Sequence, residues 1–468
     1  MTTTQSKRKT FPARINNMAE QLRNRIVEGQ YAPESLLPSE LELGKQYGLS
    51  NKSVRKVLEQ LKAEGLIEKI PRVGSVVKMR TSAAPTTTTL RIGIFSILER
   101  DIRLSRLIED FERQHPSMCI ETVPVPFPAN IEALRYYLTS GFLDGVTLYD
   151  EYFHKFIESG CTSESLEPMN RQEGIYAFLN DTFSDEGVLY AQPVVFSPVV
   201  LAYNVDHFRE AGLLEPDGSW TWADAIGHAT RLAVPGQRHG LYFYAQSDNR
   251  WPVFLLQSGS GFEPGEDGHY RLEGTKMMDN MKLCKAIIRN TDIFPTDHFL
   301  ESDSDVSELF EQGKVSMMVT TYMSLNSFSA GRVRYDISPV PYAHEPRTLV
   351  NVIGIAVNRH SANKQAARCL ADYLVSQRAQ RLIREHTLSI PALKPVAESL
   401  SIVNKSPGSL PRFHMFRDIM AGYRMHRDLR LSTTAFGELR HLLKRYWSGL
   451  IDDEQLCKEV DAVVTGNR

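Results

Sequence analysis

The chain has 468 residues and a mass of 53.0 kDa, which corresponds to two or three domains of ordinary size. Hydrophobic residues make up 42% of it, which excludes a disordered chain. The net charge of −2 hides an asymmetry, because residues 1–80 carry 15 Lys/Arg and 8 Asp/Glu, or +7, and the remainder carries −9. A basic N-terminal part on an acidic body indicates that this part contacts a polyanion.

The sequence has no run of about 18 uncharged apolar residues, the length of a membrane-spanning helix. The first 14 residues are polar and basic and lack the apolar core of a secretory signal. The five cysteines are scattered and form no Cys/His metal-binding pattern. We therefore expect a cytoplasmic protein with reduced thiols, no metal site and no cofactor.

Residues 81–89 contain no charge and no bulky apolar side chain, so they are typical of a linker. The change in charge sign falls at the same place. The expected organisation is a small domain at 11–80, a linker at 81–89 and a larger body at 90–468.

The small domain has the pattern of a winged helix-turn-helix, an α+β fold. A stripe of apolar residues predicts a first helix, Ser39 and Glu42 form a capping box before a second that ends at Gly48, and Ser50 can cap a third. Two short alternating strands follow, joined by turn residues 71–74. The apolar stripe consists of Ile15, Met18, Leu22 and Ile26.

In this fold the N-terminal residues of the third helix enter the major groove of DNA. Here they are Asn51, Lys52, Ser53 and Arg55, whose side chains hydrogen-bond to base edges and phosphates. Arg72 and Gly74 lie at the tip of the hairpin, where an arginine can reach a minor groove. The sequence therefore predicts binding to double-stranded DNA.

The same segment resembles the N-terminal domain of the GntR family of bacterial transcription regulators. The resemblance rests on Leu37-Pro-Ser-Glu40 and on the Ser-x-x-Ser-Val-Arg motif from Ser50 to Arg55. It implies DNA contacts by Ser39, Ser50, Asn51, Lys52, Ser53, Arg55 and the hairpin around Gly74. The chain departs from the usual pattern at Glu34, Asn51 and Lys52 and in the hairpin, which leaves the operator sequence open.

The body begins with apolar strands and amphipathic helices in alternation, at 90–97, 104–111, 119–126, 131–138, 145–148 and 152–159. This order predicts a parallel sheet in an α/β domain. A long apolar stretch at 192–204 is expected to cross into a second lobe with helices at 221–233, 276–290 and 306–312. Strands are expected at 240–245, 315–320 and 349–357, before a long helix at 364–385. Two such lobes form a cleft at their strand ends.

The body contains no catalytic motif, phosphate loop or zinc-binding motif, so we expect that it is not an enzyme. Aromatic residues instead stand next to polar ones at 149–152, 196–197, 247–251 and 320–322. Flat aromatic faces combined with carboxylates and amides suit sugars, which have apolar ring faces and hydroxyl edges.

Nearly all of 90–460 is similar to the bacterial solute-binding family that includes maltose-binding protein, through an ordered series of short matches such as 108–116, 186–193, 201–213 and 313–318. The resemblance implies a two-lobed α/β fold of the periplasmic-binding-protein type (type II). It also implies an effector site between the lobes, formed by Asp150, Glu151, Ser197, Asp248, Trp251, Tyr322 and Asn351.

The interpretation that follows is a transcription regulator, a repressor acting as a homodimer, whose effector is a sugar or oligosaccharide. One alternative is a body like a pyridoxal-phosphate aminotransferase, which GntR-type domains also carry. That alternative requires a Schiff-base lysine next to Ser or Thr and an aspartate for the pyridine nitrogen, and the sequence offers no convincing Ser-x-x-Lys motif. Another alternative is a body that only dimerises, with its cleft filled by aromatic side chains.

Overall fold

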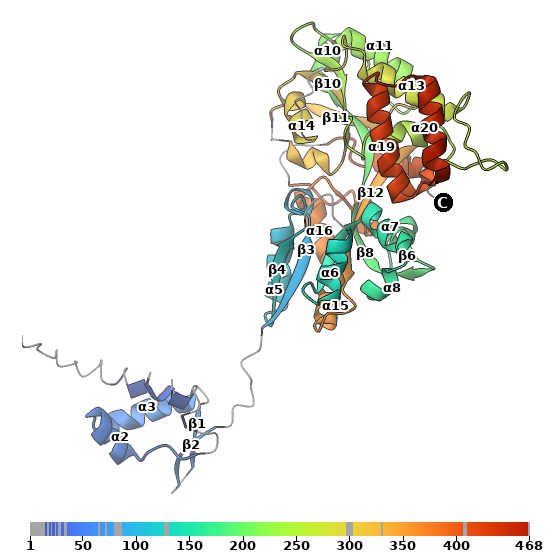
Figure 1. Ribbon diagram of the computed structural model, residues 1–468. Helices are drawn as coiled ribbons and strands as arrows, with labels where there is room; N and C mark the ends of the chain where they lie inside the picture. The colour runs from blue at the N-terminus through green and yellow to red at the C-terminus, as the bar shows by residue number, and fades with distance from the viewer. Residues whose placement is uncertain are drawn as a thin grey trace, which may run out of the picture. The chain divides into compact units, whose positions relative to one another are not determined.

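The computed structural model describes residues 35–63, 66–70, 73–78, 87–125, 131–295, 303–328, 331–405 and 410–466, together with residues 15, 18, 19, 21–23, 25, 26, 30 and 31. The chain divides into two compact units, Met1–Thr86 and Thr87–Arg468, whose helices and strands are labelled in Figure 1.

The first unit has the predicted winged helix-turn-helix fold. It contains α2 (Glu40–Tyr47), α3 (Asn51–Ala63), β1 (Ile67–Ile70) and β2 (Gly74–Val77). Ser39 and Glu42 form the predicted capping box, and α2 ends at Gly48 in the left-handed conformation. The strands pair antiparallel, from Ile67 opposite Val77 to Ile70 opposite Gly74. The helical residues Ile15 and Ile26 pack on this core, which includes Met18, Leu22, Leu43, Val54, Val57, Leu58, Leu61 and Ile67.

The second unit begins with three parallel strands, as the alternation of strands and helices predicts. β3 (Thr88–Ile94) lies between β4 (Met118–Pro124) and β5 (Gly145–Tyr149). β3 starts inside the segment assigned to the linker, so the expected linker end at 89 is wrong. Thr88 and Thr89 pair with Met118 and Cys119, because β-branched side chains suit an extended strand.

Two long strands then change the sheet from parallel to mixed. β8 (Ala191–Asn204) and β12 (Thr348–Val357) are buried along their whole length and pair antiparallel, and β12 is also antiparallel to β5. The expectation of a parallel sheet therefore holds only for its first part. The path is β4-β3-β5-β12-β8-β10-β9, with β9 (His239–Tyr242) and β10 (Val315–Thr321), while β11 (Tyr335–Pro339), β13 (Ile390–Pro391) and β14 (Tyr423–Arg424) pair beside it.

Helices cover the sheet in two groups joined by β8 and β12, as Figure 1 shows. The first lobe contains β3–β5, the small hairpin β6 (Ser184–Asp185) and β7 (Val188–Leu189), and the helices α4 (Leu98–Ile102), α5 (Leu104–Gln114), α6 (Ile131–Thr139), α7 (Asp150–Glu158), α8 (Thr162–Ser165), α9 (Ala177–Thr182), α15 (Lys364–Leu374), α16 (Gln377–His386) and α17 (Lys394–Ala397). The second lobe contains β9–β11, α10 (Val205–Glu210), α11 (Trp222–Leu232), α12 (Pro252–Leu256), α13 (Lys276–Ile288), α14 (Asp303–Glu311) and the 3-10 helix η1 (Ser324–Ser327).

The C-terminal part differs most from the expected elements. The single helix expected at 364–385 is two helices, because the Ser376 hydroxyl accepts a hydrogen bond from Ala379 N–H and starts α16 anew. Residues beyond 410 form α18 (Met415–Asp418), η2 (Met420–Gly422), η3 (His426–Leu429), α19 (Thr433–Trp447) and α20 (Asp453–Gly466), none of which the sequence pattern predicted. α19 packs on α13 of the second lobe and also contacts α7 of the first.

Candidate functional site

The predicted DNA-contacting residues of α3 differ in exposure. Asn51 and Lys52 are exposed, whereas Ser53 is buried and its hydroxyl lies 3.0 Å from that of Ser50. Ser53 N–H also donates to Ser50 Oγ, so this pair caps the helix. The Arg55 side chain is 66% exposed, and its Nε donates to Glu40 Oε2 at 2.6 Å. This hydrogen bond lowers the pKa of Glu40.

The remaining predicted DNA contacts lie at α2 and at the hairpin. Ser39 is exposed, and its hydroxyl donates to Glu42 Oε2 at 2.8 Å. Gly74 has φ +133°, a conformation that L side chains rarely adopt, so a glycine fits the hairpin tip. Arg72 lies outside the described residues.

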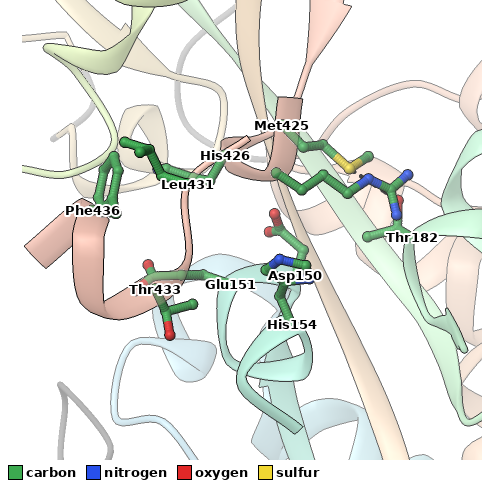
Figure 2. Close-up of a pocket in the computed structure, with 10 residues that line it drawn as sticks. Asp150, Glu151, His154, Thr182, Met425, His426, Leu431, Thr433 and Phe436 are labelled. Atoms are coloured by element: carbon green, nitrogen blue, oxygen red, sulfur yellow. Dashed lines mark hydrogen bonds between the residues drawn. The ribbon is translucent and has the colours of Figure 1, made fainter. Parts of the chain in front are cut away.

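A hollow in the second unit lies between α7 and the segment 425–436, as Figure 2 shows. It is lined by Asp150, Glu151, His154, Thr182, Met425, His426, Arg427, Leu431, Thr433 and Phe436. α7 therefore supplies acidic and imidazole groups, and the opposite wall adds an apolar face. Among the ten lining residues, the sequence analysis assigned Asp150 and Glu151 to the effector site.

Asp150 is the most constrained polar group of the hollow. It is buried at the start of α7, directly after β5, and its Oδ1 accepts a hydrogen bond from Val352 N–H at 3.0 Å. Burial raises the pKa of Asp150 to about 6, against the opposing effect of a positive charge on His426. The carboxylate of Asp150 and the imidazole of His426 therefore interact electrostatically across the hollow.

His426 is held by the second lobe. Its Nε2 lies 2.8 Å from the carbonyl oxygen of Asp248, so Nε2 carries the proton. Nδ1 is buried, has no partner among the described residues and is an acceptor in the neutral ring. The Asp248 carboxylate accepts from Arg440 at 2.6 Å, and its Oδ1 is buried without a partner. Phe436 stacks on Trp251 with ring centroids 5.2 Å apart.

Five of the predicted effector residues do not line this hollow. Asp248 and Trp251 lie behind its second wall, as above. Tyr322 is fully buried, and its hydroxyl donates to the carbonyl oxygen of Phe413 at 2.9 Å. Ser197 accepts from Met323 N–H at 3.0 Å, and Asn351 stands opposite it in the pairing of β8 with β12.

The sequence analysis missed the second wall entirely, and also His154 and Thr182. One local signal was available: Ser432 caps α19, its hydroxyl accepting from Ala435 N–H, and the apolar positions of 433–447 follow a helical period. Nothing in the sequence shows that this helix meets α7.

The described residues offer neither a metal site nor a membrane-spanning helix. They contain no group of three or more His, Cys, Asp or Glu side chains placed to hold a metal ion. None of the helices described here has both the length and the apolar composition that crossing a membrane requires.

The fold and these sites define a winged-helix unit of the DNA-binding kind joined in one chain to a two-lobed α/β solute-binding body. Residues 14–77 match the family described as bacterial regulatory proteins, gntR family, and residues 106–408 match the family described as bacterial extracellular solute-binding protein. The second match covers more than half of the chain, so the chain belongs to the bacterial extracellular solute-binding protein family. These two matches give no support to the alternative of a body like a pyridoxal-phosphate aminotransferase.

Individual relatives agree with this division. The chain is 23% identical over 341 residues to the galactooligosaccharide-binding protein of Bacillus subtilis (strain 168), covering 70% of this chain and 78% of that protein. It is 43% identical over 60 residues to the uncharacterized HTH-type transcriptional regulator YieP of Escherichia coli (strain K12), covering 13% of this chain and only 26% of that regulator.

A solved structure shows the same fold in the body. It is an ABC substrate-binding protein of Listeria monocytogenes in complex with cycloalternan, with a TM-score of 0.68 and 18% identity, covering 81% of this chain and 98% of that one.

Proposed function

We propose that this protein is a DNA-binding transcription regulator whose affinity for its operator is controlled by a saccharide bound in the hollow between α7 and residues 425–436. The observation that carries the proposal is the presence, in one chain, of a GntR-family region and a solute-binding body. Relatives and structural neighbours of the body carry galactooligosaccharide or cycloalternan in their names, which supports a carbohydrate effector.

The residues of α3 take different roles in the proposed DNA complex. Asn51, Lys52 and Arg55 are exposed and contact base edges or phosphates in the major groove. Ser39, Ser50 and Ser53 hold the helix N-termini, where backbone N–H groups and hydroxyls meet phosphate oxygens. Arg72 and Gly74 place the hairpin in the adjacent minor groove.

The hollow offers a saccharide both kinds of contact that it needs. The carboxylates of Asp150 and Glu151 and the imidazole of His426 accept hydrogen bonds from hydroxyl groups. Phe436 presents an aromatic ring to the apolar side of a sugar. Asp248 and Trp251 contribute indirectly. The Asp248 carbonyl oxygen accepts a hydrogen bond from His426, and Trp251 stacks on Phe436.

The regulator acts in the cytoplasm as a homodimer and represses transcription until the effector binds. The effector contacts α7 of one lobe and the segment 425–436, so it favours the arrangement in which both walls are close. An effector changes DNA affinity only if it prefers one of two arrangements of the dimer. Such coupling is typically about 1–3 kcal/mol, or roughly 5–150-fold in operator affinity.

The test measures operator binding by fluorescence anisotropy, with DNA from upstream of the protein's own gene and a panel of sugars. We expect tight binding without sugar and at least a 5-fold loss of affinity with one member of the panel. Asp150→Asn should lose this response and keep sugar-free DNA binding, whereas Arg55→Ala should weaken DNA binding and keep binding of the sugar, measured by calorimetry. Two results would refute the proposal. The protein could bind no DNA specifically, or it could bind a sugar without any change in its affinity for the operator.

A further inference from the structure

Arg384, on α16 of the first lobe, is a buried guanidinium with unused hydrogen-bond donors. The residue is 4% exposed, and neither Nε nor Nη1 has a hydrogen-bond partner among the residues that the structure describes. No carboxylate lies within ion-pair distance of it in the described part of the chain. The guanidinium lies over the ring of Phe413, whose centroid is 3.7 Å from Cζ.

Neighbouring arginines of the same helix show how unusual this is. Arg378 is 60% exposed and still donates two hydrogen bonds to the carboxylate of Asp110, at 2.6 and 2.7 Å. Arg381, also 60% exposed, pairs with Glu385 at 2.8 Å. Arg384 is thus the most buried of the three arginines and the one without a carboxylate partner among the described residues.

A second unpartnered nitrogen lies close to Arg384. Nε2 of His414 is buried and makes no hydrogen bond. The ring centroids of His414 and Phe413 are 5.3 Å apart, so Arg384 and His414 both lie beside the Phe413 ring. Burial and then the charge of Arg384 lower the pKa of His414. The charge of Arg417 also lowers the pKa of His414, and the charge of Glu398, which accepts a hydrogen bond from the Tyr176 hydroxyl at 2.9 Å, raises it.

Removing a charge from water costs more free energy than a single cation–π contact returns. The Phe413 ring therefore does not offset the burial of Arg384. Burial also lowers the pKa of Arg384 to about 10, the direction expected for a cation without a counter-ion. An oxyanion would supply both the missing charge and acceptors for the unused N–H groups.

We propose that Arg384 and His414 form a binding site for a small oxyanion, a phosphate or a carboxylate, separate from the hollow at α7. The guanidinium provides the charge and the donors from Nε and Nη1, His414 adds a donor from Nε2 when its ring is protonated, and Phe413 covers one face of the guanidinium. The anion is either free in solution or the acid group of a larger ligand, since both present the same oxygens.

The test uses inorganic phosphate as the probe and the full chain as the protein. Thermal unfolding is followed with 0–20 mM phosphate against chloride at matched ionic strength. We expect a saturable rise of about 1–2 °C in the wild type. Arg384→Met should abolish this rise, and Arg381→Met, at an exposed position of the same helix, should keep it.

Two other variants test the proposal if Arg384→Met does not fold. Arg384→Lys retains the charge but loses the planar fork, so it should weaken phosphate binding about tenfold in calorimetry. His414→Phe should weaken it less. Binding of glucose 6-phosphate through Arg384, without binding of phosphate alone, would place the same oxyanion on a larger ligand.

Either of two results overturns the proposal. One is a phosphate response of equal size in Arg384→Met and the wild type, which would place the anion elsewhere. The other is a wild type that responds to no anion while Arg384→Met is more stable, which would show a buried charge without a ligand.

Discussion

The carboxylate of Glu158 accepts hydrogen bonds from the backbone N–H of Thr433, at 2.9 and 3.1 Å, and from its hydroxyl. Glu158 is the last residue of α7 and Thr433 the first of α19, so this contact joins the two walls of the hollow. A negative charge at the N-terminus of α19 is also favoured by the helix dipole. The contact therefore stabilises the arrangement in which both walls face the same ligand.

Glu158→Ala should weaken effector binding about 3- to 10-fold, because a charge-assisted hydrogen bond at a half-buried position contributes about 1 kcal/mol. Calorimetry with the sugar identified in the panel measures the change. Glu158→Gln, which keeps one acceptor, should lie between the alanine variant and the wild type. Glu109→Ala, on the exposed side of α5, serves as the control. An equal loss of effector affinity in that variant would show that the contact between Glu158 and Thr433 does not contribute to effector binding.

The protonation of Asp150 should appear in the pH dependence of stability. Its pKa is about 6 in the folded chain and 3.8 as a reference, so the folded state binds the proton more tightly. The unfolding free energy should therefore fall as pH rises from about 4 to 6, by on the order of 2 kcal/mol for this group. His426 lowers and Glu151 raises the pKa of the same carboxylate, so both shift the pH range over which stability changes.

Asp150→Asn removes this contribution, so its unfolding free energy should change less between pH 4 and pH 7 than that of the wild type. Burial raises the pKa of Asp101 to about 6 as well, so the difference between variant and wild type isolates Asp150. Urea unfolding at a series of pH values measures the difference. Parallel curves for Asp150→Asn and wild type would contradict the prediction, and exposed Asp418→Asn is the control.

Features fixed by neighbours in the sequence were predicted well. The Ser39–Glu42 capping box and the left-handed Gly48 depend on residues within one helical turn, and both are present. Asp150 and Glu151 were assigned to the effector site through the resemblance to solute-binding proteins, and both line the hollow. These inferences needed no knowledge of distant contacts.

Features that depend on distant packing were not predictable. The second wall of the hollow comes from residues 425–436, nearly 300 positions after α7, and no local pattern connects the two. Trp251 and Tyr322 were expected to offer open faces, yet both are fully buried. An aromatic residue next to polar ones has the same local sequence whether it stacks on Phe436 or on a ligand.

Arg55 should be the strongest single contributor to operator recognition. In the unbound chain it pairs with Glu40, which it must leave to reach a base. Arg55→Ala should weaken specific binding about 10- to 100-fold and reduce the dependence of log affinity on log salt by about one unit. Glu40→Gln should instead strengthen DNA binding about 2- to 5-fold, since an exposed pair is worth about 0.2–1 kcal/mol.

Anisotropy titrations at several salt concentrations measure both effects. Lys62→Ala, in the last turn of α3, is the matched control, and its affinity should stay close to that of the wild type. A loss of the same size in Lys62→Ala would indicate that charge alone governs binding.

The bond between Arg378 and Asp110 should govern acid stability of the first lobe. Asp110 is 3% exposed at its side chain and also accepts from the Tyr373 hydroxyl at 2.9 Å. The hydrogen bonds from Arg378 are the main cause that lowers the pKa of Asp110 to about 2. Its contribution to stability is therefore present above about pH 4 and is lost as pH falls toward 2.

Arg378→Ala should cost about 1–3 kcal/mol at pH 7, because a buried carboxylate loses its main partner. The cost should shrink toward pH 2.5, where protonation of Asp110 begins in the wild type as well. Denaturant unfolding at both pH values measures it. Arg381→Ala breaks an exposed i,i+4 pair with Glu385 on the same helix and should cost no more than about 0.5 kcal/mol at either pH. Equal costs for the two variants at pH 7 would show that the burial of Asp110 does not strengthen its pair with Arg378.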